Sequence, residues 1–451
     1  MPAIEHQARA RAPIAGSSSS IEPTEPTEPS EPTESTEPTE PPNPRTPEPP
    51  SPRAPRAQRA VRKAARARAP LMGYPPVAMI PFNRPARIEA GLTLIAEAVR
   101  SGRIAGDGPF CRRAEQLLEG ALGTRRALLT TSCTHALEMA GLLLDLAPGD
   151  EVIVPAFTFV STVNAFVLRG ARPVFADVRR DTLNLDEAHV ARLVTRRTRA
   201  IVPVHYAGVA CEMDALGELA AQCGAVIIED NAHGLFGAYR GRPLGTLGAL
   251  ATQSFHETKN FSCGEGGALL VNDARFVDRA EIIREKGTDR SRFFRGQVDK
   301  YTWQEVGSSY VVSDILGALL VAQLEARREI QGRRAALWAR YASELADWAA
   351  AHDARLPIVP AHCDQAFHMF YLRVPASRRP AFLEHLKARG VQAVFHYVPL
   401  HLSPMGLRHG GAAGMCPVTE AVSDELVRLP FYADLDDADQ GRVIDAVRSF
   451  H

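Results

Sequence analysis

The feature that most constrains the fold is a series of short apolar runs that alternate with helical stretches between residues 151 and 271. The runs have the length and the β-branched composition of buried strands. They lie at 151–155, 173–177, 200–205, 225–230, 251–255 and 267–271. Amphipathic stretches follow the first three runs, at 161–168, 186–194 and 213–223. This order predicts a largely parallel sheet that is covered by helices on both faces.

Composition divides the chain near residue 78. Residues 1–78 are dominated by Pro, Glu, Thr, Ser, Arg and Ala, and the stretch 53–68 carries seven basic residues without an acidic one. Such a segment has little to bury, so we predict a disordered tail. An anion-binding segment and sequence upstream of a start at Met72 or Met79 are the alternatives. We assign residues 79–325 to a large domain and residues 326–451 to a small C-terminal α/β domain.

Other features exclude several classes of protein. The seven cysteines are odd in number and show no Cys-x-x-Cys spacing, which argues against a disulfide framework or a zinc site and favours the cytoplasm. No apolar run approaches the roughly 20 residues that a membrane span requires. We expect neither a nucleic-acid partner nor a bound metal.

Three segments carry side chains that are suited to chemistry at the strand ends, where parallel sheets bind ligands. Lys259 follows a strand and lies close to hydroxyl residues, as a lysine that forms a Schiff base near an anion would. Asp230 ends a buried strand and suits a pyridinium partner. Residues 130–134 open a helix with hydroxyl side chains, which suits a phosphate. Each signal alone also fits a surface lysine, a salt-bridge partner or a simple helix cap.

At these residues the sequence resembles the DegT/DnrJ/EryC1/StrS family of sugar aminotransferases, over essentially all of residues 79–451. The resemblance rests on seven motifs in order, at 105–108, 132–134, 155–162, 204–208, 229–233, 254–259 and 264–267. It implies the aspartate-aminotransferase fold (type I), pyridoxal 5′-phosphate (PLP) as cofactor and a homodimer.

The resemblance also implies roles for individual residues. Lys259 is the lysine that holds the cofactor covalently and moves the proton. Asp230 pairs with the pyridine nitrogen, His233 lies near the phenolic oxygen, and Phe159 stacks on the ring. The phosphate is held by Thr134, His135 and Ser254, and Ser309 stands where many members place an Asn that reaches the partner subunit's site.

Further segments, at 284–303, 307–310 and 395–401, resemble a subgroup of the family. Its members move the amino group of L-glutamate to C4 of dTDP-4-keto-6-deoxyglucose and supply dTDP-4-amino-4,6-dideoxygalactose for enterobacterial common antigen or related glycans. The basic segment is the candidate site for the sugar-nucleotide diphosphate, because guanidinium groups bind phosphate oxygens in pairs. It contains Arg290, Arg292, Arg295, Lys300 and Tyr301; a solvated loop or a dimer contact is the alternative.

Three rival functions remain open at this point. One is an aminotransferase for another nucleotide-linked keto sugar, since selectivity can depend on one or two side chains. The second is a related PLP dehydratase, in which histidine replaces the lysine. The third is a regulatory paralogue that binds PLP without catalysis. Lys259 and Asp230 are both present, which argues against the second and third.

Overall fold

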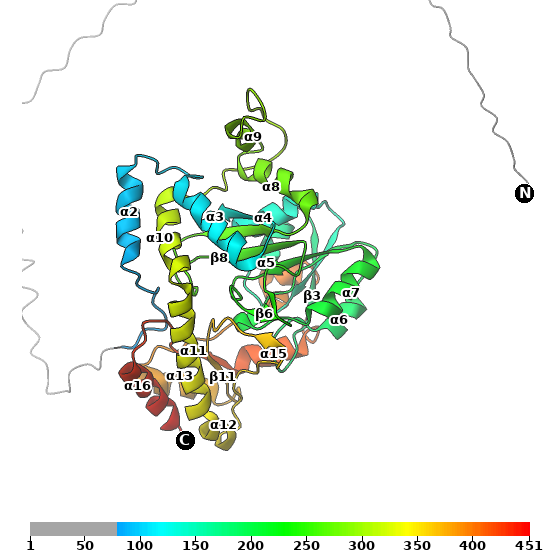
Figure 1. Cartoon of the computed structure of the whole chain (residues 1–451). Helices are drawn as coiled ribbons and strands as arrows, with labels where there is room; N and C mark the ends of the chain where they lie inside the picture. The colour runs from blue at the N-terminus through cyan, green and yellow to red at the C-terminus, as the bar shows by residue number, and fades with distance from the viewer. Residues whose placement is uncertain (1–78) are drawn as a thin grey trace, which may run out of the picture. The chain divides into compact units, whose positions relative to one another are not determined.

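The computed structural model describes residues 79–451, and the predicted tail at 1–78 lies outside them. The central element is a seven-stranded sheet in the order β1-β9-β8-β5-β4-β2-β3. Figure 1 shows this sheet with helices packed around it. Its strands are β1 (Arg126–Thr130), β2 (Glu151–Pro155), β3 (Arg172–Ala176), β4 (Thr198–Ile201), β5 (Val226–Asp230), β8 (Leu250–Ser254) and β9 (Gly267–Val271). Only β9 runs antiparallel to its neighbours β1 and β8. The predicted, largely parallel sheet is therefore confirmed, and β1 is a strand that the sequence analysis missed.

Helices cover both faces of this sheet because successive side chains of a strand point in opposite directions. Val152 and Val154 pack with α4 (Cys133–Leu143), α5 (Ser161–Val167) and α8 (Val277–Arg284). Ile153 points the other way, toward α6 (Glu187–Leu193) and α7 (Met213–Cys223). Beside β1, β9 and β8 that second face is covered by α2 (Ala90–Arg100), α3 (Pro109–Leu122) and α10 (Asp314–Glu325). The sheet is thus buried on both sides, as its continuous apolar runs predicted.

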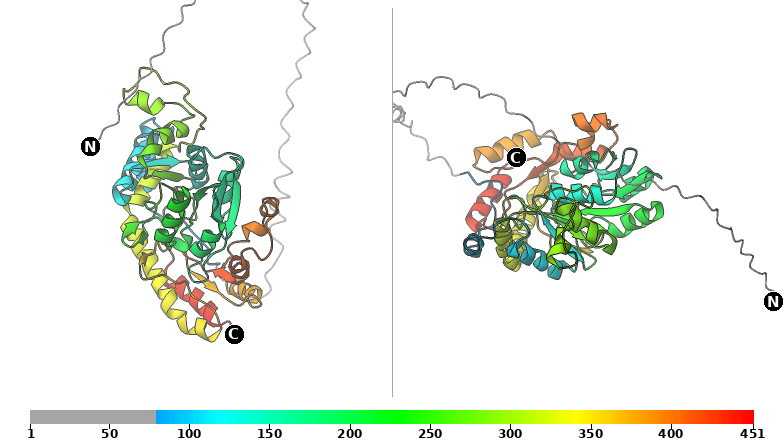
Figure 2. Two further views of the ribbon diagram at one scale, coloured as in Figure 1. Left: turned by 90° about the vertical axis from the view of Figure 1, so that its right-hand side faces the viewer. Right: turned by 90° about the horizontal axis from the view of Figure 1, so that it is seen from above.

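The C-terminal elements form a second apolar core of their own. They are α11 (Arg327–Glu344), α12 (Ala346–Ala351), α13 (Arg379–Ala388), α16 (Asp437–Arg448) and the two-stranded sheet of β11 (Tyr371–Arg373) and β12 (Leu426–Arg428). Figure 2 shows these elements, yellow to red, grouped together beside the green and cyan sheet. The predicted boundary after residue 325 falls between α10 and α11.

Two segments cross that boundary. Ile80, at the start of the described chain, pairs with Val391 and is buried in the C-terminal core. In the opposite direction, β10 (Cys363–Asp364) pairs with β6 (Ala238–Tyr239), which pairs in turn with β7 (Arg242–Pro243). Each part of the chain therefore contributes a segment to the other, which a single domain boundary in the sequence does not describe.

The C-terminal part is also fixed to the end of a central strand. Asp177 directly follows β3, and its carboxylate accepts hydrogen bonds from the backbone N–H groups of Val418 and Thr419 at 2.9 and 2.8 Å. These two residues lie in the first turn of α15 (Pro417–Glu425). The contact holds the C-terminal part against the carboxyl edge of the sheet, where ligands of such sheets bind.

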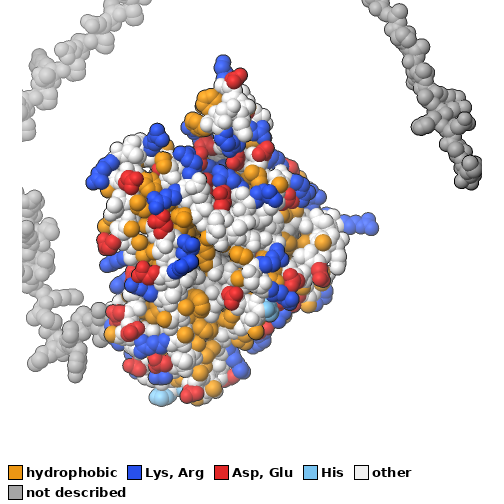
Figure 3. All heavy atoms as spheres, in the orientation of Figure 1, with side chains coloured by type: hydrophobic (Ala, Val, Ile, Leu, Met, Phe, Trp, Pro, Cys, Tyr) orange, Lys and Arg blue, Asp and Glu red, His pale blue; other side chains and the backbone are white. Residues whose placement is uncertain are grey.

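The remaining elements are short. The predicted strand 200–205 ends already at Ile201, and the chain continues into Pro203, which has no N–H to donate to a strand neighbour. Two small helices are α9 (Arg290–Phe294) and α14 (Pro404–Arg408). The segment around α9 stands out from the rest of the surface (Figure 3). Within residues 79–451, no helix combines the length and apolar character that crossing a membrane requires.

Candidate active site

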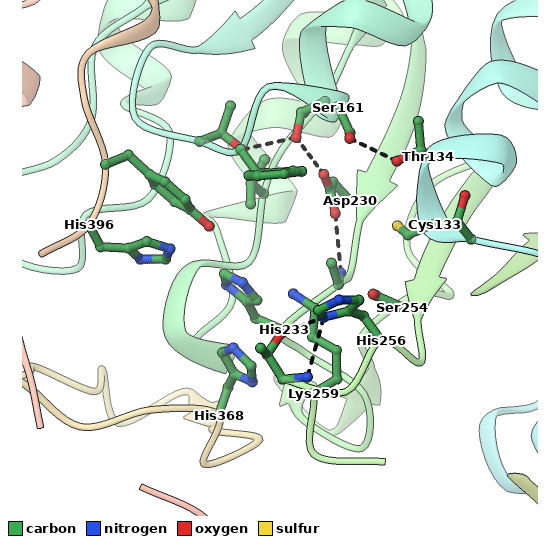
Figure 4. A pocket seen from close by; sticks show the side chains of 18 of the residues that line it. Cys133, Thr134, Ser161, Asp230, His233, Ser254, His256, Lys259, His368 and His396 are labelled. Carbon is green, nitrogen blue, oxygen red and sulfur yellow. Dashed lines mark hydrogen bonds between the residues drawn. The ribbon is translucent and has the colours of Figure 1, made fainter. Parts of the chain in front are cut away.

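A cavity of about 510 Å³ lies where β5 and β8 end and α4 begins (Figure 4). Six residues that the sequence analysis selected line it: Thr134, Phe159, Asp230, His233, Ser254 and Lys259. In Figure 4, Thr134 and Ser254 lie on one side of the cavity, and His396 and His368 lie on the other. The motifs that are spread over the sequence therefore converge on one site.

Strand geometry explains why only one of two adjacent carboxylates reaches the cavity. Glu229 and Asp230 are neighbours in β5, so their side chains point to opposite faces of the sheet. Glu229 is fully buried and accepts hydrogen bonds from the N–H groups of Gly245, Leu247 and Gly248 at 2.7–2.8 Å. It also lies 2.9 Å from the Nε2 atom of buried His205. Glu229 thus has a structural role, and Asp230 is left to serve the cavity.

Asp230 is held by hydroxyl groups from the segment that follows β2. The Oγ1 atom of Thr162 donates to its Oδ2 atom at 2.7 Å, and Thr158 lies 2.9 Å from Thr162 in turn. Its other oxygen accepts from the N–H group of Ala232 at 3.2 Å. The side chains of Asp230, Thr162 and Thr158 are all buried. These contacts hold the Asp230 carboxylate in one orientation beside the cavity, which suits a partner for a protonated ring nitrogen.

Lys259 lies in the loop that follows β8, and its amine is enclosed by the cavity. Burial lowers its pKa to about 8, and the positive charge of Arg428 acts in the same direction. The nearby Asp230 carboxylate opposes this shift. With this pKa about a tenth of the amine is unprotonated at pH 7, far more than for an ordinary lysine, and the unprotonated form is the nucleophile that attacks an aldehyde.

The start of α4 forms an anion site on one side of the cavity. The N–H groups of Cys133 and Thr134 belong to the first turn, where helix donors have no partner within the helix. The Thr134 hydroxyl lies 2.8 Å from Ser161. Gly267 packs so closely on the peptide between Ser132 and Cys133 that a Cβ atom there would lie 2.4 Å from the Cys133 nitrogen. Gly267 of the motif 264–267 is thus required by close packing beneath this turn.

The groups of His135, which the resemblance places at the phosphate, are engaged elsewhere within the described chain. Its N–H group donates to the Oγ atom of Ser132, the residue that caps the helix, at 3.1 Å. Its ring bonds Thr131 and packs edge-on against Tyr310. Neither its backbone donor nor its ring is among the groups that line the cavity. The backbone N–H groups that remain free at the start of α4 are those of Thr134 and Cys133.

Histidine rings form the wall beside Lys259. His233 stacks on His368 with 4.1 Å between ring centroids, and His368 lies 2.9 Å from the Oδ1 atom of Asn260. Burial lowers the pKa of both histidines well below the usual value, so both rings are neutral. Nδ1 of His233 is buried without a hydrogen-bond partner among residues 79–451. A polar ligand that reached His233 would find a neutral ring that is held in one plane.

The basic segment predicted for the diphosphate lies outside this cavity. Arg290, Arg292 and Arg295 belong to α9 or follow it, and each lies within 3.6 Å of a carboxylate oxygen. Lys300 and Tyr301 are exposed on the same segment, and none of the five residues lines the cavity of this chain. Ser309 is exposed and pairs through its backbone with Glu285. Within one chain, the structure does not bring these six residues to the site.

Asn231 follows Asp230 and is fully buried. Neither its Nδ2 nor its Oδ1 atom has a hydrogen-bond partner within the described chain. Its amide fills the space that a Cβ atom at Gly234 would need, only 2.1 Å away. The residue therefore packs beneath the site, and nothing in the structure explains why an amide is used there.

Among the cavity-lining residues that the sequence analysis did not select individually are Phe82, His368, His396, Tyr397 and Arg428. All come from the C-terminal part or from the first residues of the described chain. The only signal for them was the resemblance at 395–401, which includes His396 and Tyr397.

The donor set fits PLP on the evidence of this structure. A lysine with a lowered pKa, a fixed carboxylate and free N–H groups at a helix start face one cavity, and an aromatic ring, Phe159, lies on its wall. These are the groups that an aldehyde, a pyridinium nitrogen, a phosphate and a ring face require. The aldehyde carbon would be held by Lys259, the ring nitrogen by Asp230, and the phosphate by the N–H groups of Cys133 and Thr134.

Comparison with known proteins identifies the family and the fold. The sequence profile described as the DegT/DnrJ/EryC1/StrS aminotransferase family matches residues 86–448. The aminotransferase TlmJ from Streptoalloteichus hindustanus is 32% identical, with a TM-score of 0.75 over 82% of this chain and 98% of that one. The sugar aminotransferase CalS13 from Micromonospora echinospora is 26% identical, with a TM-score of 0.75 over 83% and 100%. The PLP form of Spr1654 from Streptococcus pneumoniae is 26% identical, with a TM-score of 0.76 over 82% and 98%. These matches confirm the predicted type I fold and the cofactor.

Proposed function

Because this chain belongs to the DegT/DnrJ/EryC1/StrS family of PLP-dependent aminotransferases, we propose that it moves the amino group of L-glutamate to C4 of dTDP-4-keto-6-deoxyglucose. The product is dTDP-4-amino-4,6-dideoxygalactose, a building block for cell-surface glycans. One observation carries the proposal of an aminotransferase in particular: Lys259 and Asp230 face the same cavity from the ends of the neighbouring strands β8 and β5.

PLP, when bound, supplies an electron sink that stabilises negative charge at the reacting carbon. The residues of this chain orient the reacting groups and move the proton. Asp230 lines the cavity with its carboxylate, which accepts a hydrogen bond from Thr162 at 2.7 Å and so keeps one orientation. The Nζ atom of Lys259 is buried, exchanges its proton near neutral pH and is placed to carry that proton between donor carbon and cofactor. Neutral His233 and His368 wall the site without adding a competing charge.

Support for the sugar acceptor comes from the segment 395–401. This segment resembles the dTDP-sugar subgroup, and its first three residues, Phe395, His396 and Tyr397, line the cavity. Nδ1 of His396 lies 3.0 Å from the hydroxyl of buried Tyr206, which fixes the ring at the cavity wall. Selectivity between keto sugars can arise from such a wall, since one or two side chains are enough.

We further propose that the active protein is a homodimer. The surface formed by residues 285–309 carries apolar side chains in solvent: Phe294, Trp303 and Val306 are 68%, 77% and 64% exposed. Exposed aromatic side chains in this number are typical of an interface. Ser309 and the α9 arginines are exposed on the same surface, and we propose that they contact the second copy there.

The test is a two-step reaction on the PLP-loaded protein. Glutamate is added first while the visible absorption of the cofactor is followed, and dTDP-4-keto-6-deoxyglucose is added next, with the product identified by mass and NMR. We expect the absorption to change with glutamate and to return with the sugar, and the product to carry the new amine in the galacto configuration. Return of the absorption with a GDP- or UDP-linked keto sugar alone would show an aminotransferase with another acceptor. No change with glutamate would contradict the proposed donor.

A further inference from the structure

His368 comes from the C-terminal part of the chain and reaches the wall of the cavity that holds Lys259. Its backbone N–H group donates to the carbonyl oxygen of Ala207 at 3.4 Å. Its own carbonyl oxygen accepts from the Nη2 atom of buried Arg334 at 2.6 Å. The backbone of His368 is therefore held from both parts of the chain, and its ring is placed at the cavity.

Asn260 determines which ring nitrogen of His368 carries the proton. The Nδ2 atom of Asn260 donates to the backbone carbonyl oxygen of Ala366 at 2.7 Å, so its Oδ1 atom is the one that faces Nδ1 of His368, at 2.9 Å. An amide oxygen only accepts hydrogen bonds, so Nδ1 of His368 is protonated. Burial lowers the pKa of His368 well below its usual value, and the ring is therefore neutral. Because Asn260 directly follows Lys259, it connects this ring to the loop of the catalytic lysine.

His233 lies against the ring of His368, with 4.1 Å between the centroids and 12° between the planes. Its Nδ1 atom is buried without a hydrogen-bond partner among residues 79–451, so Nε2 is the atom left for a ligand in the cavity. Burial lowers the pKa of His233 as well, and the neutral ring carries one proton. Buried donors without a partner are rarer in proteins than buried acceptors without one, which favours the proton on Nε2. His233 thus offers the cavity a single donor.

The position of His233 corresponds to one edge of the cofactor ring. In PLP the ring nitrogen lies opposite the aldehyde carbon, and the phosphate arm and the phenolic oxygen are attached to the two carbons beside it. With the nitrogen at Asp230 and the aldehyde at Lys259, the phosphate and the oxygen lie on opposite sides of the line between these residues. Figure 4 shows Ser254 on one side of that line and His233 on the other. The phenolic oxygen is therefore on the side of His233, as the resemblance to the family implies.

We propose that His368, held by Asn260, is a positioning residue for the cofactor: its ring fixes the plane of His233, so that the Nε2–H group of His233 donates to the phenolic oxygen of PLP. This inference rests on the proposed function, because it assumes that PLP lies in the cavity with its nitrogen at Asp230. A hydrogen bond weakens steeply as its angle departs from a straight line, so a tilted His233 ring would bind the oxygen poorly. The C-terminal part of the chain thereby acts on the cofactor through two stacked rings.

The charged side chains that act on the two stacked histidines are cations, namely Lys259, Arg428 and, for His368, also Arg334. The rings of Tyr206 and His396 lie beside His233, with centroids 5.9 and 6.3 Å away. Burial lowers the pKa of His396 well below its usual value, so this ring is neutral too. Cations disfavour a protonated imidazole, so none of these histidines titrates at neutral or alkaline pH.

The experiment follows the visible absorption of the PLP-loaded protein between about pH 6 and 10, without donor or sugar. The phenolic oxygen shares a proton with the nitrogen of Lys259. Loss of a donor to this oxygen holds that proton more tightly and raises the pH midpoint of the absorption change. His368→Asn keeps an N–H group for Asn260 but removes the stacked ring, whereas His368→Phe keeps a stacked ring but removes the N–H group. We expect the midpoint to rise by about one pH unit in His368→Asn and by less than about half a unit in His368→Phe.

Two further variants separate positioning from packing. His233→Phe keeps the stack and removes the donor, so it should show the full rise, and addition of His368→Asn should then change nothing further. His362→Asn is the matched control. His362 lies on the same segment and makes the same kinds of contact, a bond to Glu212 at 3.1 Å and a ring contact with Tyr239 at 5.4 Å, but it does not line the cavity. This variant should lower the thermal stability and leave the midpoint unchanged.

Several outcomes would overturn the assignment. One is an unchanged midpoint in His368→Asn. Equal rises in His368→Asn and His368→Phe would assign the effect to the bond with Asn260 and not to the stack. A further rise in the double variant would show that His368 acts independently of His233, and a rise in His362→Asn would show that the midpoint reports general loosening of the segment. Because neither donor nor sugar is present, failure of the wild-type protein to react with glutamate would contradict the proposed function and leave these results unaffected.

Discussion

The cavity at Lys259 and the segment around α9 both concentrate charged side chains, yet they differ in what those charges contact. Lys259 and Arg428 are enclosed, and neither is paired with a carboxylate at ion-pair distance within the described chain. The arginines of α9 are half exposed, and each has a carboxylate neighbour, such as Asp278 at 2.6 Å from Arg292. Charge density in the sequence is therefore a poor guide to a binding site. Burial without a partner is the better one, because it leaves an interaction for a ligand to complete.

Within this comparison of the cavity with the α9 segment, we expect the largest effect from a change of Asp230. Replacing it with Asn preserves its size and an oxygen that can accept from Thr162, but it removes the negative charge in the cavity. We expect kcat/KM for glutamate to fall by about 10²–10³-fold, the range for loss of one preorganised electrostatic group. Circular dichroism should show an unchanged fold. Activity within threefold of the wild type would mean that this carboxylate does not serve the cofactor.

The enclosure of Lys259 predicts a pH dependence. Because its pKa lies at about 8, the reactive unprotonated fraction should rise about tenfold per pH unit below pH 8 and level off above it. Acylation of Lys259 in the cofactor-free protein, measured by peptide mass spectrometry between pH 6 and 10, checks this. The exposed Lys300 in the same digest corrects for decay of the reagent. A rate that still rises between pH 9 and 10 would contradict the effect of burial.

Glu229→Gln is the matched control for Asp230→Asn, since the two residues are adjacent on β5. The amide cannot accept all the N–H groups that the carboxylate accepts, so at least one buried donor is left unsatisfied. We expect the free energy of unfolding to fall by about 1–3 kcal/mol in urea titrations. The glutamate reaction of the folded protein should change little. The reverse pattern, lost reaction with unchanged stability, would mean that Glu229 acts in the cavity.

Arg290→Ala should have the smallest effect. The residue lies outside the cavity, and its pairing with Glu285 at 3.6 Å is partly exposed, so the glutamate reaction should stay within about twofold. Steady-state kinetics with both substrates sharpen the comparison. A rise in KM for the sugar nucleotide alone would place α9 at the partner's cavity, in agreement with the sequence prediction. Equal losses with both substrates would show that α9 supports the cavity of its own chain.

Features that depend on residues close together in the sequence were predicted, and features that depend on distant residues were not. The helix 213–223 was placed correctly because its apolar spacing is local, and Gly224 ends it in a left-handed conformation. Asp230 and Lys259 were found because they follow strands, where ligands bind in such sheets. The strand β1 was missed because it joins the sheet only through the distant β9.

Phe82, His368 and Arg428 could not be found from local patterns. Each reaches the cavity only after the C-terminal part has packed against the sheet, more than 100 residues from Lys259 along the chain. Arg428 in particular is one polar residue in a short strand, which is the usual pattern of a half-buried strand. Its missing counterion is visible only in three dimensions. The predicted role of the α9 arginines at the diphosphate stays a prediction, because within one chain they contact the carboxylates at 278, 281 and 285 and do not line the cavity.

A single-turnover measurement tests the central claim most directly. The PLP-loaded protein is mixed with L-glutamate in the absence of any acceptor, and the 2-oxoglutarate formed is counted per chain, beside a Lys259→Ala variant. The account predicts one 2-oxoglutarate per chain, since no sugar is present to restore the cofactor, and none from the variant. Absence of product from the wild-type protein, or equal product from the variant, would contradict the assignment of Lys259 and the cavity around it as an aminotransferase site.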